Sequence, residues 1–245
     1  MAQFRTQEGE PKALLFDVFG TVVDWRTSAI AELTSFGHAR GLTADWVAFA
    51  DDWRGIYQPS MEDIRSGQRP FTVLDNLHRD SLHKLLRKYD LPQVQEAEIE
   101  QLVTIWHRLR PWPDVIDGLY RLKRRFIIGT LSNGNIGLMV RLAKHAGLPW
   151  DAVLGAEIAG DYKPKSDVYI RSARALNLDE RECMLVAAHN DDLRAAAAVG
   201  YQTAFIARPT EYGPNQTKDQ HATQAWDIVT DGFAGLADLL NCPRY

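Results

Sequence analysis

The chain has few cysteines, no long apolar run and no cluster of positive charge. Two cysteines among 245 residues are too few for a disulfide framework. No segment approaches the roughly 20 consecutive apolar residues of a membrane helix, and the polar start at residues 3–10 has no signal-peptide core. We therefore expect a cytoplasmic protein without a disulfide scaffold or a membrane span.

A nucleic-acid surface is not expected either, because phosphate binding needs clustered Lys and Arg and the formal net charge is −4. The composition, 45% hydrophobic and 24% charged, is that of a globular chain long enough for one large domain or a domain with an insert. Cys183 borders the apolar run Met184–Val186. We interpret it as a packed thiol, and neither it nor Cys242 as a nucleophile.

Apolar runs of strand length alternate with segments of helical period, which predicts an α/β fold with a parallel sheet covered on both faces. The expected strands are Ala13–Phe16, Phe126–Leu131, Met184–Ala187 and Thr203–Ile206. The expected helices between them are Ile136–Ala146, Ser166–Leu176 and Asp192–Val199.

Residues from about 25 to 111 interrupt this alternation, because they have helical periodicity and no convincing strand. The helices expected here are Ser28–His38, Asp45–Tyr57, Phe71–Tyr89 and Glu96–Arg108, ended by signals such as Gly41, Pro59, Pro70 and Pro92. We predict a core domain of residues 1–24 and 110–245 and an inserted helical domain of residues 25–109. Since ligands bind beyond the carboxyl ends of parallel strands, the insert would stand over the site as a cap.

Asp17 follows the apolar strand 13–16 directly and is itself followed closely by Gly20 and Thr21. A buried carboxylate without a partner is costly, so Asp17 must meet a cation, hydrogen-bond donors or a substrate. We interpret it as a catalytic carboxylate. The alternative is that its side chain only caps the next turn.

Polar residues follow the other strands as well, and the carboxyl ends of parallel strands meet in one crevice. Ser132 and Asn133 either cradle an anion or cap the next helix. Lys163, held before a proline, is either a site residue or the more common surface lysine. Residues 189–192 gather an imidazole, an amide and two carboxylates, although Asp191 alone could be a helix N-cap.

These motifs follow one another as Asp-x-x-Gly-Thr from Asp17, Ser-Asn from Ser132, Lys-Pro from Lys163 and an acidic fourth motif that ends at Asp192. In this order they resemble the haloacid dehalogenase superfamily, from residue 12 to about residue 205. The resemblance implies a Rossmann-like parallel-sheet core, with the helical insert after the first strand as a cap domain. It also suggests a homodimer.

The resemblance leaves a choice between phosphatases and dehalogenases. Phosphatases of this superfamily carry a second Asp that protonates the leaving alkoxide, and Phe19 stands at that position. A phenyl ring cannot donate a proton, whereas a halide leaves without one. These phosphatases also hold Mg²⁺ with an acidic pair in motif four, whose first member falls on Ala188, although Asp191 could substitute. We therefore expect no metal and no other cofactor.

The details are similar to the type II 2-haloacid dehalogenases, which convert short (S)-2-haloacids to (R)-2-hydroxyacids. This similarity implies that Asp17 displaces the halide from C2 and forms an ester, and that Asp192 activates the water that hydrolyses it. Lys163 would stabilise the nucleophile and the anionic intermediate. Thr21 and Tyr169 would orient Asp17 and its partners by hydrogen bonds.

Substrate recognition would fall on the insert and on the second motif. Arg54 matches the arginine that receives the departing halide, although its sequence context also fits a surface arginine paired with Asp51 or Asp52. Asn133 is the expected second halide donor, and Ser132 is expected to bind the substrate carboxylate. The apolar lining would include Phe19, Trp53 and Tyr57.

Motif four departs from the usual pattern, with Ala187 and His189 in place of Ser and Asn and Asp191 in place of an aromatic halide contact. His189 would either hold the hydrolytic water and assist Asp192 as a base, or donate to a backbone carbonyl. These changes leave the preferred halogen and the natural substrate open. They do not predict activity on fluoroacetate.

Three alternatives to a dehalogenase remain at this stage. The first is a Mg²⁺-dependent phosphatase, and the second is a hydrolase that opens a strained ring on a carboxylate substrate through the same Asp17 ester. The third is a binding protein that kept the fold without catalysis. Such a protein would have little reason to keep Asp17, Lys163 and Asp192 together.

Overall fold

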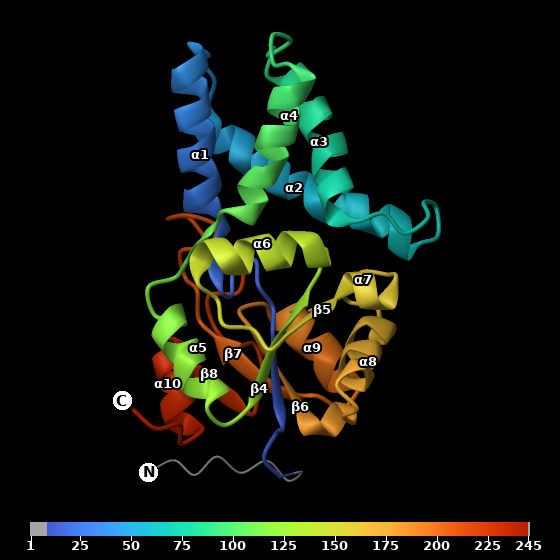
Figure 1. The fold of residues 1–245 in the computed structure, drawn as a ribbon, viewed down its shortest axis with the longest axis vertical. Coiled ribbons are helices and arrows are strands. Elements are labelled where there is room, and N and C mark those ends of the chain that lie inside the picture. Colours follow the sequence, from blue (N-terminus) through green and yellow to red (C-terminus); the bar gives the residue numbers. More distant parts are fainter. Residues whose placement is uncertain (1–8, 245) are drawn as a thin grey trace.

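The computed structural model describes residues 9–244 and has a six-stranded sheet in the order β5-β4-β1-β6-β7-β8 (Figure 1). All neighbouring strands in it are parallel. The strands are β1 (Ala13–Phe16), β4 (Ile127–Ser132), β5 (Ala152–Gly155), β6 (Cys183–Ala187), β7 (Gln202–Ile206) and β8 (Ile228–Thr230). The predicted α/β fold with a parallel sheet is therefore confirmed.

Alternate side chains of the central strand β1 supply two hydrophobic cores, one on each face of the sheet. Leu14 and Phe16 belong to one cluster of buried side chains, and Ala13 and Leu15 belong to the other. The first face is covered by α5 (Val115–Lys123), α6 (Ile136–Ala146) and α10 (Phe233–Leu239). The second is covered by α8 (Ser166–Ala175) and α9 (Asn190–Ala198). Along the chain, the short α7 (Ala156–Ala159) precedes α8, and η2 (Glu180–Glu182) follows it.

The chain leaves the sheet after β1 and builds a helical layer before it returns to β4. This layer consists of α1 (Trp25–Arg40), α2 (Trp46–Arg65), α3 (Leu74–Lys88), α4 (Glu96–Val103) and η1 (Thr104–His107). Figure 1 shows it at one end of the molecule, above α6 and the sheet. The chain enters the helical layer through β2 (Val23–Asp24) and leaves it through β3 (Arg110–Pro111). These two strands pair as an antiparallel ribbon. The predicted domain boundaries lie next to this ribbon, and the division into two domains stays a prediction.

Contacts between side chains and backbone fix the helical layer to loops of the sheet. Arg65 Nη1 at the end of α2 donates to the Lys163 carbonyl at 2.7 Å. Tyr162 Oη donates to the Thr72 carbonyl at 2.6 Å. A third contact joins Asp75 at the start of α3 to Asn135 at the start of α6. The loops that carry Lys163 and Asn133 are therefore hydrogen-bonded to the helical layer.

One prediction about elements was wrong, and two strands were missed. Pro59 does not end a helix, because α2 continues through it to residue 65. The residues beyond it, Met61 and Ile64, are buried in the core, and their burial offsets the hydrogen bond that a proline removes. Strands β5 and β8 were not predicted, because each is only partly buried and neither forms a continuous buried apolar run like that of β1.

No helix within residues 9–244 is both long and apolar enough to cross a membrane. The expectation of a polar start without a signal-peptide core concerns residues 3–10, of which 3–8 lie outside the described residues.

Two glycines inside helices should respond to alanine with opposite signs. A Cβ at Gly118 of α5 would collide with Phe233 of α10, whereas a Cβ at the exposed Gly55 of α2 would meet nothing within 4 Å. Gly118→Ala is expected to lower the free energy of unfolding by about 1–3 kcal/mol through overpacking. Gly55→Ala is expected to raise it by about 0.5–1 kcal/mol through helix propensity. Urea denaturation of both variants measures the two changes, and equal signs would contradict the packing argument.

Candidate active site

Asp17 lies one residue beyond β1, and its backbone N–H continues the pairing with β6 by donating to the Val186 carbonyl at 3.0 Å. The residue is only 6% exposed. Its Oδ2 accepts hydrogen bonds from Thr21 Oγ1 at 2.7 Å and from His189 Nδ1 at 3.1 Å. Its Oδ1 accepts from Lys163 Nζ at 2.9 Å. Asp17 therefore meets donors and cations, as its place in an apolar sequence predicted.

The Lys163 ammonium lies between two carboxylates, at 2.9 Å from Asp17 Oδ1 and 2.5 Å from Asp192 Oδ2. Burial alone would raise the pKa of Asp17, but Lys163 and His189 hold that pKa below its ordinary range. Burial would likewise lower the pKa of Lys163, and the two carboxylates raise it. Asp17 and Lys163 therefore stay charged at neutral pH, with Asp17 as an anion.

Asp192 and Tyr169 form the second half of this arrangement. Asp192 stands in the first turn of α9, and its Oδ1 accepts from Tyr169 Oη at 2.6 Å. Burial, followed by the charge of Asp192, raises the pKa of Tyr169, so the phenol keeps its proton and remains a donor. The structure thus brings together six predicted side chains, which are Asp17, Thr21, Lys163, Tyr169, His189 and Asp192.

A cavity of about 620 Å³ opens over this cluster, between the sheet and α2. Phe19, Arg54, Tyr57 and Asn133 line it, together with most of the cluster. The Arg54 guanidinium lies over the Tyr57 ring, 4.0 Å from its centroid. Asp51 and Asp52 do not hold Arg54, because they pair with Arg26 and Lys88.

The Arg54 side chain has one donor without a hydrogen-bond partner among the described residues. Its Nε is buried and has no hydrogen-bond partner among residues 9–244. Asn133, on the other wall, uses its Oδ1 to accept the Lys163 backbone N–H at 2.9 Å, so that its amide is held at the cavity. A buried guanidinium donor and a fixed amide beside an anionic carboxylate form a polar pocket with donors for a second anion.

Two predicted substrate contacts, Ser132 and Trp53, are not among the residues that line the cavity, and their roles in binding stay predictions. Ser132 is fully buried. Its Oγ accepts the Gly134 N–H at 3.0 Å and closes the turn after β4. Trp53 points into the helical layer, where its Nε1 donates to the His78 carbonyl and to Ser81 Oγ. Its ring packs edge-on against Trp106, with 5.4 Å between the centroids.

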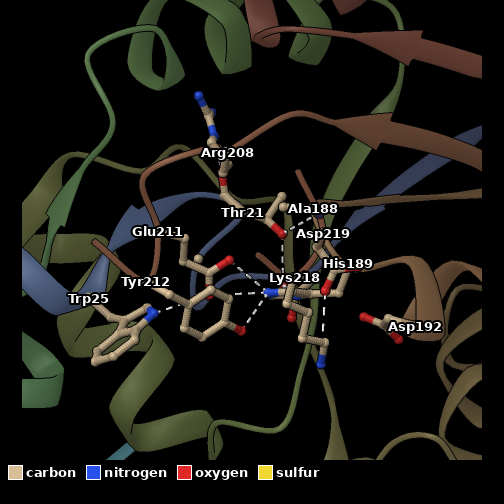
Figure 2. A network of polar contacts seen from close by, with 12 residues as sticks. Thr21, Trp25, Ala188, His189, Asp192, Arg208, Glu211, Tyr212, Lys218 and Asp219 are labelled. Atoms are coloured by element: carbon tan, nitrogen blue, oxygen red, sulfur yellow. Dashed lines mark hydrogen bonds and ion pairs between the residues drawn. The ribbon is translucent and has the colours of Figure 1, made fainter. Parts of the chain in front are cut away.

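His189 takes neither of the two places expected for it. Instead of a backbone carbonyl or Asp192, its Nδ1 contacts Asp17. Its Nε2 contacts Glu211 Oε2 at 2.9 Å (Figure 2). Glu211, in the loop after β7, is a site residue that the sequence did not predict. The signal was present, since Arg208, Glu211 and Tyr212 follow a strand end like the other motifs.

Asp191 and Cys183 lie away from the reacting groups. Asp191 pairs with Arg194 at 2.6 Å through a largely exposed side chain at the cavity rim, and so points away from the interior. Cys183 is fully buried in β6, and burial raises the pKa of its thiol to about 12. It is a packed thiol, as predicted.

Comparisons with known proteins agree with this geometry. A family model for haloacid dehalogenase-like hydrolases matches residues 11–200. The chain belongs to the haloacid dehalogenase-like hydrolases. It is 46% identical to a solved defluorinating L-2-haloacid dehalogenase, with a TM-score of 0.95, covering 98% of this chain and 100% of that one.

Two further relatives of this haloacid dehalogenase-like hydrolase carry similar names. A second solved L-2-haloacid dehalogenase is also 46% identical, with a TM-score of 0.92 over 95% of this chain and 99% of that one. An (S)-2-haloacid dehalogenase of Pseudomonas sp. (strain YL) is 26% identical over 225 residues, which cover 89% of this chain and 90% of the relative.

His189 makes the stability of this haloacid dehalogenase-like hydrolase depend on pH in a defined direction. Burial would lower the pKa of His189, but Glu211 and Asp17 raise it well above its ordinary value of 6.5. The stabilisation is complete below pH 6.5, where both states hold the proton. It is lost as pH rises toward the folded pKa, because the unfolded chain releases the proton first.

We therefore expect the free energy of unfolding to fall above about pH 6.5 by up to about 1.4 kcal/mol per pH unit. His189→Gln should lack this component. Urea unfolding of both proteins between pH 6 and 9 measures it as a difference. A difference that is constant across this range would contradict a raised pKa.

Proposed function

We propose that this protein hydrolyses short (S)-2-haloacids to (R)-2-hydroxyacids through an ester on Asp17. One observation carries the proposal, namely an anionic carboxylate in a cavity whose wall presents an arginine with an unused buried donor. A haloacid presents an electrophilic carbon between a carboxylate and a leaving halide. The arrangement offers a nucleophile for the carbon and donors for both anions.

In the first step, an Asp17 oxygen attacks C2 of the substrate while the halide leaves with the electron pair of the carbon–halogen bond. Arg54 and Asn133 would stabilise the charge that develops on the halogen. A single in-line displacement inverts the configuration at C2, which accounts for an (R) product from an (S) substrate. Lys163 keeps Asp17 ionised before the attack.

In the second step, water attacks the carbonyl carbon of the ester, and Asp192 takes its proton. Tyr169 and Lys163 hold Asp192 by both of its oxygens, so the base is fixed in orientation. Collapse of the tetrahedral intermediate expels the hydroxyacid and restores Asp17. The oxygen of the water therefore enters Asp17 rather than the product.

Residues around Asp17 favour this chemistry over phosphate transfer. Phe19 lies at the cavity, packed edge-on against Tyr57 and Trp106, and offers no proton to a leaving alkoxide. The nitrogens of Lys163 and His189 already contact the Asp17 oxygens that would ligate a cation. The names of the relatives support the same assignment, and one of them is described as defluorinating. Fluoroacetate therefore belongs in the substrate panel.

The proposal has three parts beyond the reaction. The aromatic rings of Phe19 and Tyr57 in the cavity favour short haloacids over long ones. The homodimer that the family resemblance implies and the cytoplasmic location that the sequence predicts are the other two parts. Sedimentation equilibrium would test the dimer.

Halide release in the presence of EDTA is the direct test. The purified protein should release halide from L-2-chloropropionate and chloroacetate and not from D-2-chloropropionate. Asp17→Asn, which keeps the shape of the side chain and removes the nucleophile, should abolish release. Halide from the D-isomer would contradict the stereochemistry, and no halide from any substrate would redirect the assignment to strained-ring carboxylates and then to phosphate esters with Mg²⁺.

Arg54 should contribute through the transition state. Arg54→Gln is expected to lower kcat for halide release by about 10²–10³-fold, as for the loss of one preorganised charge-stabilising donor. Arg79→Gln, which removes an arginine that pairs with Glu96 on the surface of the helical layer, is the matched control. Single-turnover halide release measures the step. Equal rates for the two variants would remove Arg54 from the halide site.

A further inference from the structure

His189 must carry two ring protons in this structure. Its Nδ1 faces Asp17 Oδ2 at 3.1 Å, and its Nε2 faces the Glu211 carboxylate at 2.9 and 3.1 Å. An ionised carboxylate only accepts hydrogen bonds, so each nitrogen has to donate one. The ring is therefore an imidazolium cation and has no lone pair with which to act as a base.

Glu211 is built to hold this cation. The residue is 1% exposed, and Trp25 Nε1 donates to its Oε1 at 3.1 Å. Its carboxylate also occupies the space beside Gly20, where any Cβ would collide with it. Figure 2 shows the resulting chain of contacts from Trp25 through Glu211 to His189. Glu211 and Asp17 together outweigh the effect of burial and raise the pKa of His189.

The two oxygens of Asp17 are not equivalent. Among the described residues, Oδ2 accepts from two donors, Thr21 and His189, while Oδ1 accepts only from Lys163. Oδ1 therefore keeps a lone pair for attack on the substrate carbon, and Oδ2 becomes the acyl oxygen of the ester. The acyl oxygen then already faces one neutral and one cationic donor, which is the arrangement that stabilises a tetrahedral oxyanion.

We propose that the His189 imidazolium and the Thr21 hydroxyl form the oxyanion hole for hydrolysis of the Asp17 ester, with Glu211 as the positioning residue that keeps His189 protonated. This inference rests on the proposed function. His189 then serves as an electrophile and leaves the role of base to Asp192. A family position that is usually an uncharged amide has acquired a full positive charge with its own counter-ion.

The electrons and protons of the step balance with these groups alone. Water adds to the Asp17 carbonyl carbon, its proton passes to Asp192, and the π electrons move onto Oδ2, where His189 and Thr21 donate to it. The carbonyl re-forms as the bond between the acyl carbon and Oδ1 breaks. Oδ1 leaves with the product as an alkoxide, which takes the proton from Asp192 and becomes the hydroxyl of the hydroxyacid. The second proton of the water leaves to solvent when the Asp17 carboxylate is restored.

The test separates ester formation from ester hydrolysis. With L-2-chloropropionate, rapid-quench measurements give the first burst of halide, and intact-protein mass spectrometry gives the fraction of Asp17 ester. Glu211→Gln keeps the shape and the bond to Trp25 but removes the counter-ion. We expect its burst rate to stay within about threefold of wild type, its ester hydrolysis to fall by about 10–100-fold, and the ester to accumulate.

A pH profile distinguishes an electrophile from a base. In Glu211→Gln the pKa of His189 falls, so ester hydrolysis should slow as pH rises through that pKa, because the charged form is the active one. His189→Gln should accumulate ester without this pH dependence. Glu100→Gln, an exposed carboxylate of α4 that pairs with Arg79, is the matched control and should behave as wild type.

Several outcomes would overturn the inference. Ester hydrolysis that speeds up with pH in Glu211→Gln would make His189 a base. A slower halide burst without accumulated ester would place His189 and Glu211 in the first step. An NMR titration that finds wild-type His189 neutral at pH 7.5 would exclude the imidazolium that the inference requires. Failure of the proposed function gives a different result, because wild type would then release no halide. Without an Asp17 ester, the oxyanion hole proposed for its hydrolysis would also be excluded.

Discussion

The structure depends on keeping one ionised carboxylate at the end of a fully buried strand. Asp17 continues β1, whose four residues are all buried, and a bare anion there would carry a desolvation cost of several kcal/mol. Two cations and a hydroxyl offset that cost from three different parts of the chain. The parallel sheet makes this convergence natural, because β1 lies between β4 and β6 and all three strands end at the same edge.

The same charges bind the rest of the site together. Lys163 is shared between Asp17 and Asp192, and its backbone carbonyl accepts a hydrogen bond from Arg65 of the helical layer. The loop that supplies the cation is therefore also a point where the helical layer is attached. Arg54 and Arg65 both belong to α2, so the same helix supplies a wall of the cavity and holds the loop of Lys163.

The sequence was sufficient for four of the six strands of the sheet, the helical insert and the residues around Asp17, because each of these depends on a local pattern. Asp17, Lys163 and Asp192 stand in short motifs at strand ends, and strand ends converge in any parallel sheet. The orientations of individual side chains could not be predicted from the sequence. Trp53 and Tyr57 lie one helical turn apart on α2, yet only Tyr57 reaches the cavity, and this follows from packing between helices. Glu211 could be placed beside His189 only once the loop after β7 was folded.

Gly20 gives the Asp-x-x-Gly-Thr motif a second meaning in this chain. Its backbone adopts a φ of +91°, which glycine tolerates at no steric cost, and this alone explains a glycine in the turn. The space left by its missing side chain is also the seat of the Glu211 carboxylate. A single methyl group at this position would push the anion away from the imidazole. The smallest residue of the motif thus makes room for the carboxylate that contacts a histidine far along the sequence.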